Sequence, residues 1–190
     1  MDKDQAIKIF SDAGALMEGH FKLTSGRHSN RYMQCAQVLK HPDYTEQLAK
    51  HIAEAYTGEK IDVVVGPAMG GIIVAYEVAR QLNVPGIFCE RQDGKMTLRR
   101  GFSVGQGDRV LVVEDVVTTG GSVVEVMDVV RGLGAAVVGV GVLVDRSGGK
   151  VDFGVRKEAV LTMEIESWEP ESCPLCKEGK TEAVKPGSRS

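Results

Sequence analysis

The sequence predicts an α/β fold, a doubly wound, mostly parallel sheet flanked by helices. Three observations support this prediction. Short valine-rich runs alternate with helical patterns between residues 61 and 144. These runs are apolar on both faces, as in strands buried within parallel sheets. The 23 glycines among 190 residues exceed the usual share of about 7% and suit tight loops between such strands.

The N-terminal part predicts a helix, two short strands and a second helix. Apolar residues at helical spacing predict the first helix over 4–18, with Asp2 or Asp4 as its cap. Residues 21–35 alternate irregularly around a Ser-Gly turn signal, so we expect two strands around a loop. The second helix is expected to begin at Pro42, which suits a first turn, and to end at Gly58.

The central part predicts the parallel strands of the sheet. Strands are expected at 61–65, 86–89, 110–113 and 136–144, with helices at 72–82 and 122–133. Residues 90–109 are polar, basic and glycine-containing, and predict a long loop or a small ribbon. Ligands of such sheets lie beyond the carboxyl ends of the strands, so we expect the site there.

Composition excludes several classes of protein. Lys and Arg number 23 and Asp and Glu number 26, for a net charge of −3, which argues against broad nucleic-acid binding. We expect no membrane association, because no apolar run approaches the roughly 20 residues of a membrane span. The charged N-terminus lacks a signal-peptide core. Cys35 and Cys89 are isolated within apolar, strand-like segments that favour buried free thiols, so a cytoplasmic protein with reduced thiols is expected.

Residues 110–122 carry the chemistry of the site. An apolar strand runs into Glu114 and Asp115, and a loop of threonine and glycine precedes a helix. Such a loop forms an anion-binding nest, and the helix N-terminus favours a phosphate. Carboxylates beside a phosphate require ribose hydroxyls or Mg²⁺ between them. The segment therefore predicts a sugar-phosphate site, against the simpler alternative of a turn that only caps a helix. The pattern lacks the lysine of a P-loop and the spacing of a dinucleotide site.

These residues resemble the phosphoribosyl pyrophosphate signature of the type I phosphoribosyltransferases. Three further motifs resemble the orotate enzymes of this family. Residues 21–29 with Tyr32 resemble their N-terminal substrate hood, residues 66–71 resemble their pyrophosphate loop, and Asp145-Arg146 stands where they place an arginine against orotate. The chain is most similar to a compact subgroup whose tail carries a cysteine pair.

The resemblance implies an enzyme that transfers the 5-phosphoribosyl group of phosphoribosyl pyrophosphate to orotate. The products would be orotidine 5′-monophosphate and pyrophosphate, in pyrimidine biosynthesis, with Mg²⁺ as cofactor and no direct protein ligand for it. Lys95, Arg91 and Asp115 would be catalytic, and Thr118, Arg146 and Lys22 would contact orotate. Phosphoribosyl pyrophosphate would be bound by Glu114, Asp115, Val116, Val117, Thr118, Thr119, Gly120, Gly121 and Ser122.

The resemblance also implies an organisation and an assembly. We expect one phosphoribosyltransferase domain over 1–165, with its hood over about 1–40 and its core over 60–145, followed by a tail over 166–190. The family's basic loop reaches the neighbouring subunit, so a homodimer with shared active sites is expected.

The basic loop and the hood depart from the family pattern. The loop usually reads Arg-Lys-x-x-Lys-x-His, but Gln92 replaces its second residue and Thr97 replaces its histidine. Arg99 and Arg100 are the candidate replacement cations. The hood usually has a lysine at Thr24, and Lys22, two residues away on the same face of a strand, is its candidate substitute. A lysine is also usual at Gly70.

The tail carries the cysteine pair Cys173 and Cys176. Such a pair is typical of half a zinc site, a redox pair or two inert thiols. We expect no histidine of the same chain to lie near this pair and complete a zinc site. Inert thiols therefore rank first, zinc shared between the tails of two subunits ranks second, and a redox role ranks third. The four histidines are scattered, none is assigned to catalysis, and only His28 is a candidate substrate contact.

Two rival functions remain open from the sequence. The first is a phosphoribosyltransferase for a purine base, which the 110–122 signature does not exclude. Arg146 and the hood favour orotate, because a purine has no carboxylate for an arginine to bind. The second is a non-catalytic regulator that senses phosphoribosyl pyrophosphate. It would need a nucleic-acid-binding domain or a basic face, and the sequence predicts neither.

Overall fold

Six strands form the predicted sheet, in the order β5-β4-β3-β6-β7-β8. The computed structural model describes residues 1–23 and 25–186. Neighbouring strands are parallel except β5, which pairs antiparallel with β4. The mostly parallel sheet is therefore confirmed, and the 90–109 segment begins with a small ribbon. The strands are β3 (Val63–Pro67), β4 (Gly86–Gln92), β5 (Lys95–Leu98), β6 (Arg109–Val117), β7 (Ala136–Asp145) and β8 (Arg156–Thr162).

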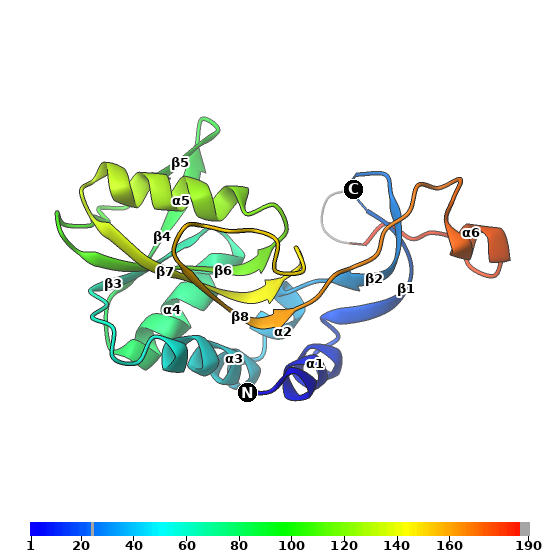
Figure 1. Cartoon of the computed structure of the whole chain (residues 1–190), viewed down its shortest axis with the longest axis horizontal. Helices are drawn as coiled ribbons and strands as arrows, with labels where there is room; N and C mark the ends of the chain where they lie inside the picture. Colours follow the sequence, from blue (N-terminus) through cyan, green and yellow to red (C-terminus); the bar gives the residue numbers. More distant parts are fainter. Residues whose placement is uncertain (24, 187–190) are drawn as a thin grey trace.

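Helices cover both faces of this sheet. α3 (Pro42–Ala55) and α4 (Gly70–Leu82) lie on one face, and α5 (Gly121–Gly132) lies on the other (Figure 1). Pro42 occupies the first turn of α3, as expected. Among the described residues, no helix has both the length and the apolar character needed to cross a membrane.

Strand β6 shows why the valine runs are apolar on both faces. Leu111 and Val113 belong to the core layer beneath α3 and α4, whereas Val110 and Val112 belong to the layer beneath α5. All four side chains are fully buried. Each contributes roughly 1.5–3 kcal/mol of transfer free energy, so the two-sided burial explains the absence of polar alternation.

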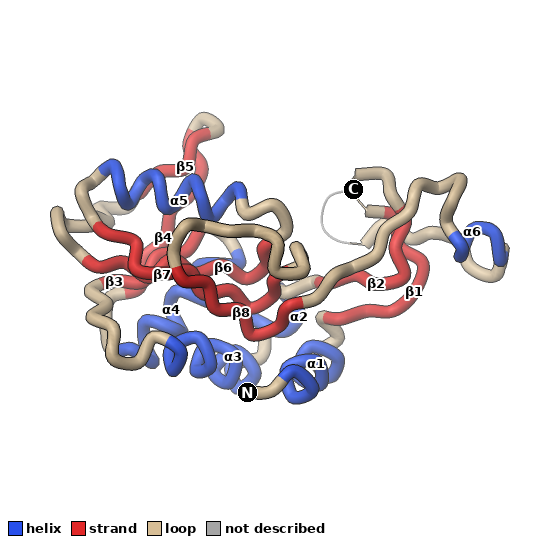
Figure 2. Tube along the Cα trace, in the orientation of Figure 1, coloured by secondary structure: helices blue, strands red, loops and turns tan. Residues whose placement is uncertain are grey.

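The hood stands at one end of the sheet body (Figure 2). It contains α1 (Lys3–Asp12), the antiparallel pair β1 (Leu16–Lys22) and β2 (His28–Met33), and the short α2 (Ala36–Leu39). Asp2 caps α1 in a reciprocal capping box with Gln5. The predicted helix over 4–18 is wrong beyond residue 12, because Gly14 adopts φ +67° and turns the chain into β1. The two strands around a loop are confirmed, with β1 beginning earlier than expected.

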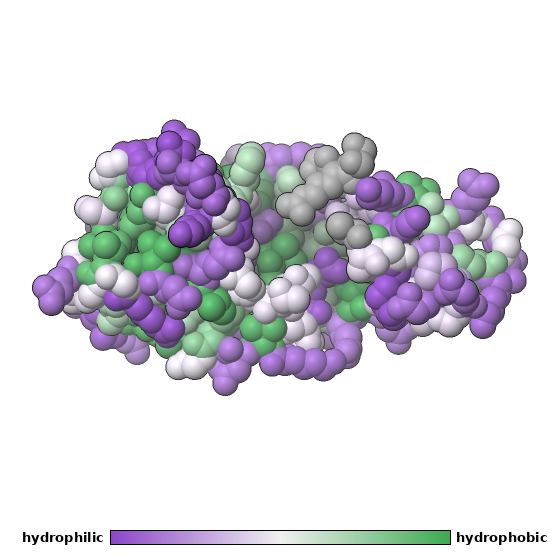
Figure 3. All heavy atoms as spheres, turned by 90° about the horizontal axis from the view of Figure 1, so that it is seen from above, coloured by the Kyte–Doolittle hydropathy of each residue, from purple (hydrophilic) through white to green (hydrophobic). Residues whose placement is uncertain are grey.

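The tail returns from β8 across the hood (Figures 1 and 2). His28 and Trp168 exchange backbone hydrogen bonds of 2.8 Å, and Lys22 N–H donates to the Val184 carbonyl at 2.8 Å. A single short helix, α6 (Pro174–Glu178), interrupts the tail. Hydrophilic side chains dominate this end of the face seen in Figure 3, whereas apolar ones gather over the sheet body.

The sheet has its topological switch point between β3 and β6. The chain leaves β3 toward β4 on one side, and leaves β6 toward β7 on the other. The connections that follow β3 and β6 therefore open at a shared edge, where ligands of such sheets bind. These connections are the 66–71 and 117–121 segments that the sequence selects.

Candidate active site

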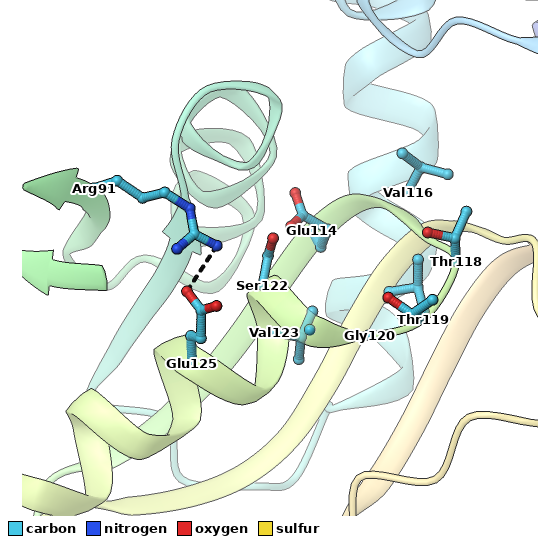
Figure 4. Close-up of a pocket in the computed structure, with 11 residues that line it drawn as sticks. Arg91, Glu114, Val116, Thr118, Thr119, Gly120, Ser122, Val123 and Glu125 are labelled. Atoms are coloured by element: carbon cyan, nitrogen blue, oxygen red, sulfur yellow. Dashed lines mark ion pairs between the residues drawn. The ribbon is translucent and has the colours of Figure 1, made fainter. Parts of the chain in front are cut away.

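A cavity of about 280 Å³ opens at the carboxyl end of β6 (Figure 4). β6 extends to Val117, because Val116 and Val117 continue the parallel pairing with β7. The expectation that the strand ends at Val113 is therefore wrong, and Glu114 and Asp115 lie within the strand. The lining residues are Arg91, Glu114, Val116, Val117, Thr118, Thr119, Gly120, Gly121, Ser122, Val123 and Glu125.

The loop between β6 and α5 has the features of an anion site. Within the described chain, the backbone N–H groups of Thr118, Thr119 and Gly120 donate no hydrogen bond. Gly120 has φ +80°, and a Cβ there would lie 2.8 Å from Val151 and 2.9 Å from Phe153. Glycine thus lets the loop pack tightly with its donors unpaired. Free donors at a helix N-terminus favour a phosphate.

Glu114 lines this cavity, whereas its neighbour Asp115 does not. Glu114 is only 8% exposed, and its Oε1 accepts from the Asp115 backbone N–H at 3.2 Å. The pyrophosphate-loop motif is brought against them, since a Cβ on Gly70 would lie 2.3 Å from Asp115 Oδ2. The lysine usual at this position of the family pattern would need a different loop path. The Ala68–Met69 peptide bond in this loop is cis.

Burial of Glu114, together with the negative charge of Asp115, raises its pKa to about 9. The folded protein therefore holds this proton at neutral pH, whereas the unfolded chain releases it near the ordinary pKa of 4.5. Stability is lost as pH rises between these two values, because the unfolded chain then binds fewer protons.

We expect Glu114→Gln to remove this pH dependence. Between pH 5 and pH 9, the unfolding free energy of the wild type should fall by about 2 kcal/mol or more relative to the variant. Urea denaturation across this range measures the difference. An exposed control, Glu54→Gln, should give a curve parallel to that of the wild type. A parallel curve for Glu114→Gln would contradict the raised pKa.

The predicted cations divide into two groups. Arg91 lines the cavity, and its guanidinium is 2.8 Å from the Glu125 carboxylate. Lys95 is exposed at the start of β5, outside this chain's own cavity. Arg99 and Arg100 pair with Glu90 at 3.5 Å and 3.1 Å. The fold therefore brings Arg91 alone among the four to the cavity wall.

The predicted orotate contacts follow β6, follow β7 and end β1 of the hood. Thr118 lines the cavity, and the Arg146 backbone N–H donates to the Val117 carbonyl at 2.8 Å. Among the described residues, Arg146 Nε has no hydrogen-bond partner although it is buried. Burial lowers the pKa of Arg146, against the opposing charges of Tyr32 and Cys35. Lys22 is exposed in the hood, and Thr24 lies outside the described residues.

Sequence reasoning missed two charged groups, Glu125 in the cavity wall and Lys157 outside it. Glu125 follows the signature segment and supplies the partner of Arg91. Lys157 binds the fully buried Asp145 at 2.6 Å. Burial would raise the pKa of Asp145, but hydrogen bonds from Lys157 and Ser147 outweigh it and hold that pKa below its usual value. Asp145 thus belongs to the framework that supports Arg146.

The structure corrects one expectation about the tail. His20 and His28 lie beside Cys173 and Cys176 in the same chain, and their ligand-type atoms are all within 4.8 Å of one another. The expectation that no histidine of the chain lies near this pair is wrong. His28 is buried there and does not line the cavity.

Comparison with known proteins identifies the family. Residues 35–172 match the model of the phosphoribosyl transferase domain. An orotate phosphoribosyltransferase of Pelotomaculum thermopropionicum is 64% identical, covering 100% of this chain and 99% of that protein. The orotate phosphoribosyltransferase of Desulforamulus reducens is 59% identical, at 100% and 98% coverage. The crystal structure of orotate phosphoribosyltransferase from Aeropyrum pernix superposes with a TM-score of 0.66 at 29% identity, covering 83% of this chain and 93% of that one.

Proposed function

The chain belongs to the phosphoribosyl transferase family, and from that membership we propose how its residues divide the reaction. The enzyme transfers the 5-phosphoribosyl group of phosphoribosyl pyrophosphate to orotate. The products are orotidine 5′-monophosphate and pyrophosphate, in pyrimidine biosynthesis. Full-length identity to orotate enzymes supports this specificity over a purine base.

One observation carries the assignment of phosphoribosyl binding. Glu114 on β6 and a loop with free backbone donors, a few residues further along the chain, line one cavity, and Asp115 adjoins Glu114 in β6. The Asp115 carboxylate and the carbonyl oxygen of the protonated Glu114 accept from the ribose hydroxyls, while the loop and the Ser122 hydroxyl donate to the 5-phosphate. A site that bound only ribose would not need the free backbone donors, and a site that bound only phosphate would not need the carboxyl groups.

The reaction requires the protein to position the substrates and to stabilise charge, and it does not require a nucleophile. As the bond to pyrophosphate breaks, the ribose acquires the positive charge of an oxocarbenium ion. Asp115 holds the ribose and offers negative charge nearby, whereas Arg91 and Lys95 act on the leaving pyrophosphate. Thr118, Arg146 and Lys22 orient orotate. Arg99 and Arg100 remain candidate replacements for the missing loop cations.

The cavity fits a divalent cation. Phosphoribosyltransferases generally require a divalent metal, and we propose Mg²⁺ here. Among the described lining residues, Arg91 is the one cation, and it is paired with Glu125. A pyrophosphate therefore needs further positive charge. When bound, Mg²⁺ would supply that positive charge, and we propose no direct protein ligand for it.

We also propose a homodimer with active sites shared between its subunits. The exposed position of Lys95 on the β4–β5 ribbon, outside its own cavity, supports this arrangement. A cytoplasmic location remains a prediction, and the four free cysteines accord with it.

Arg146→Ala is expected to weaken orotate binding selectively. An arginine fork binds a carboxylate through two charge-assisted hydrogen bonds. Its loss should raise the KM for orotate by about 10- to 100-fold, from hydrogen bonds worth about 1.5–3 kcal/mol. The KM for phosphoribosyl pyrophosphate should change little. Steady-state kinetics test this, with the exposed Arg131→Ala as the matched control. An unchanged KM for orotate would remove Arg146 from the site.

Product analysis tests the reaction directly. Purified protein, phosphoribosyl pyrophosphate, orotate and Mg²⁺ should yield orotidine 5′-monophosphate and pyrophosphate in equal amounts, resolved by phosphorus NMR. Omission of orotate should leave phosphoribosyl pyrophosphate unconsumed on the same time scale. Pyrophosphate release without the nucleotide would indicate hydrolysis and count against transfer.

A further inference from the structure

Four side chains of metal-binding type meet where the tail crosses the hood, away from the cavity. His20 lies in β1 and His28 begins β2, while Cys173 and Cys176 flank the first turn of α6. About 150 residues separate the two histidines from the two cysteines in the chain. The proposed reaction uses none of them. Their convergence therefore needs a separate physical explanation.

The spacing of the four ligand atoms matches a tetrahedral metal site. His20 Nε2 lies 2.9 Å from His28 Nδ1 and 3.6 Å from each of the two sulfur atoms. His28 Nδ1 lies 3.2 Å from Cys176 Sγ. Zinc bonds of about 2.0–2.1 Å to nitrogen and 2.3 Å to sulfur place tetrahedral ligands about 3.3–3.8 Å apart. Small movements of the side chains bring the observed distances to those of a tetrahedral zinc site.

Hydrogen bonding within the cluster does not account for this arrangement. His20 Nδ1 lies 2.9 Å from the Thr181 carbonyl, which only accepts, so Nδ1 carries the hydrogen. In the uncharged ring, Nε2 then offers one lone pair. That lone pair faces an imidazole nitrogen and two sulfurs at once, and one lone pair cannot satisfy three neighbours. A cation at the centre satisfies all four atoms. The bond from Nδ1 to a carbonyl is also the outer contact typical of metal-bound histidine.

Three of the four cluster residues are buried and Cys176 is exposed, in a part of the described chain that has few buried apolar side chains. Cys173 is fully buried, and His20 and His28 are 5% and 8% exposed. α6 has five residues, none of them buried, and hydrophilic side chains dominate this end of the face in Figure 3. Small elements without a hydrophobic core are usually stabilised by disulfides or metals. All four cysteines are free thiols.

We propose that His20, His28, Cys173 and Cys176 bind one Zn²⁺ within a single chain. Two thiolates and two imidazoles in tetrahedral arrangement favour zinc. Four protein ligands leave no open position for a substrate, so the site is structural. It fastens the tail to the hood, and the tail in turn pairs with the backbone of Lys22. Because all four ligands come from one chain, a second tail is unnecessary.

Metal analysis of the full-length protein tests the proposal. The protein is produced with zinc in the medium and purified without a metal-affinity tag. Mass spectrometry of the elements should find close to one zinc per chain. His20→Ala and Cys176→Ser should each reduce this below about 0.1 per chain. His51→Gln and Cys89→Ala, which change the same residue types outside the cluster, should keep it near one.

Two measurements on the wild type guard against variants that fail to fold. Chelation should lower the melting temperature and expose two further thiols to a thiol reagent, and added zinc should reverse both effects. Co²⁺ in place of Zn²⁺ should give the absorption of a cobalt–thiolate bond. Below about 0.1 zinc per chain in the wild type, with no cobalt–thiolate absorption, the site is refuted. A mass two hydrogens lower than the reduced chain would also refute it, as a Cys173–Cys176 disulfide.

Discussion

Replacing Asp115 with alanine is expected to lower kcat/KM for phosphoribosyl pyrophosphate by about a thousandfold, the upper end for one preorganised group. Its carboxylate is held in place, since Oδ1 accepts from the Val116 N–H at 3.0 Å and Gly70 leaves room for Oδ2. The variant loses both the hydrogen bonds to the ribose and the negative charge beside the developing oxocarbenium ion. Initial rates over a range of substrate concentrations measure the loss.

The control for this variant is Asp12→Ala. Asp12 carries the same carboxylate but pairs with Lys8 on the surface of α1. Its kcat/KM should remain within about twofold of the wild type. If Asp115→Ala keeps its melting temperature and also retains wild-type kcat/KM, the assignment of the ribose site to β6 is wrong.

Lys95→Ala is expected to lower kcat about a hundredfold, because a cation at the leaving pyrophosphate acts chiefly in the transition state. In the proposed homodimer this cation acts at the neighbouring subunit's site, since Lys95 lies outside its own cavity. Gln92→Ala in the same ribbon should retain most of the activity, since its side chain carries no charge.

Mixed dimers test the shared site. A dimer of Lys95→Ala with Asp115→Ala would contain one intact site if each site takes Lys95 from the other subunit. Random reassociation should then restore up to about a quarter of wild-type activity. Each variant reassociated with itself should stay inactive. No recovery in mixtures shown to contain the mixed dimer would place Lys95 and Asp115 in one subunit's site.

The parts of the fold that follow from local pattern were predictable from the sequence. Two-sided apolar runs predicted the parallel sheet, and Pro42 fixed the start of α3. The cavity that Glu114 and residues 116–122 line was predictable for the same reason, since strand, loop and helix are contiguous. The end of β6 was not, because only pairing with β7 extends it to Val117. The end of α1 depended on the positive φ of Gly14.

Contacts between residues far apart in the sequence could not be predicted from local sequence patterns. The pairing of Asp145 with Lys157 depends on the register of β7 and β8. The approach of His20 and His28 to the tail cysteines depends on the path of residues 166–176 across the hood. The histidines are scattered in the sequence and therefore did not indicate a metal site, although the cysteine pair indicated half of the cluster.

Orotate consumption, followed by ultraviolet absorbance, tests the reaction and its base specificity together. Purified protein, phosphoribosyl pyrophosphate and Mg²⁺ are combined with orotate, uracil, hypoxanthine or adenine in parallel. We expect turnover with orotate and none above background with the other three bases. Turnover of a purine in preference to orotate would contradict the specificity. Binding of phosphoribosyl pyrophosphate without turnover of any base would contradict catalysis itself.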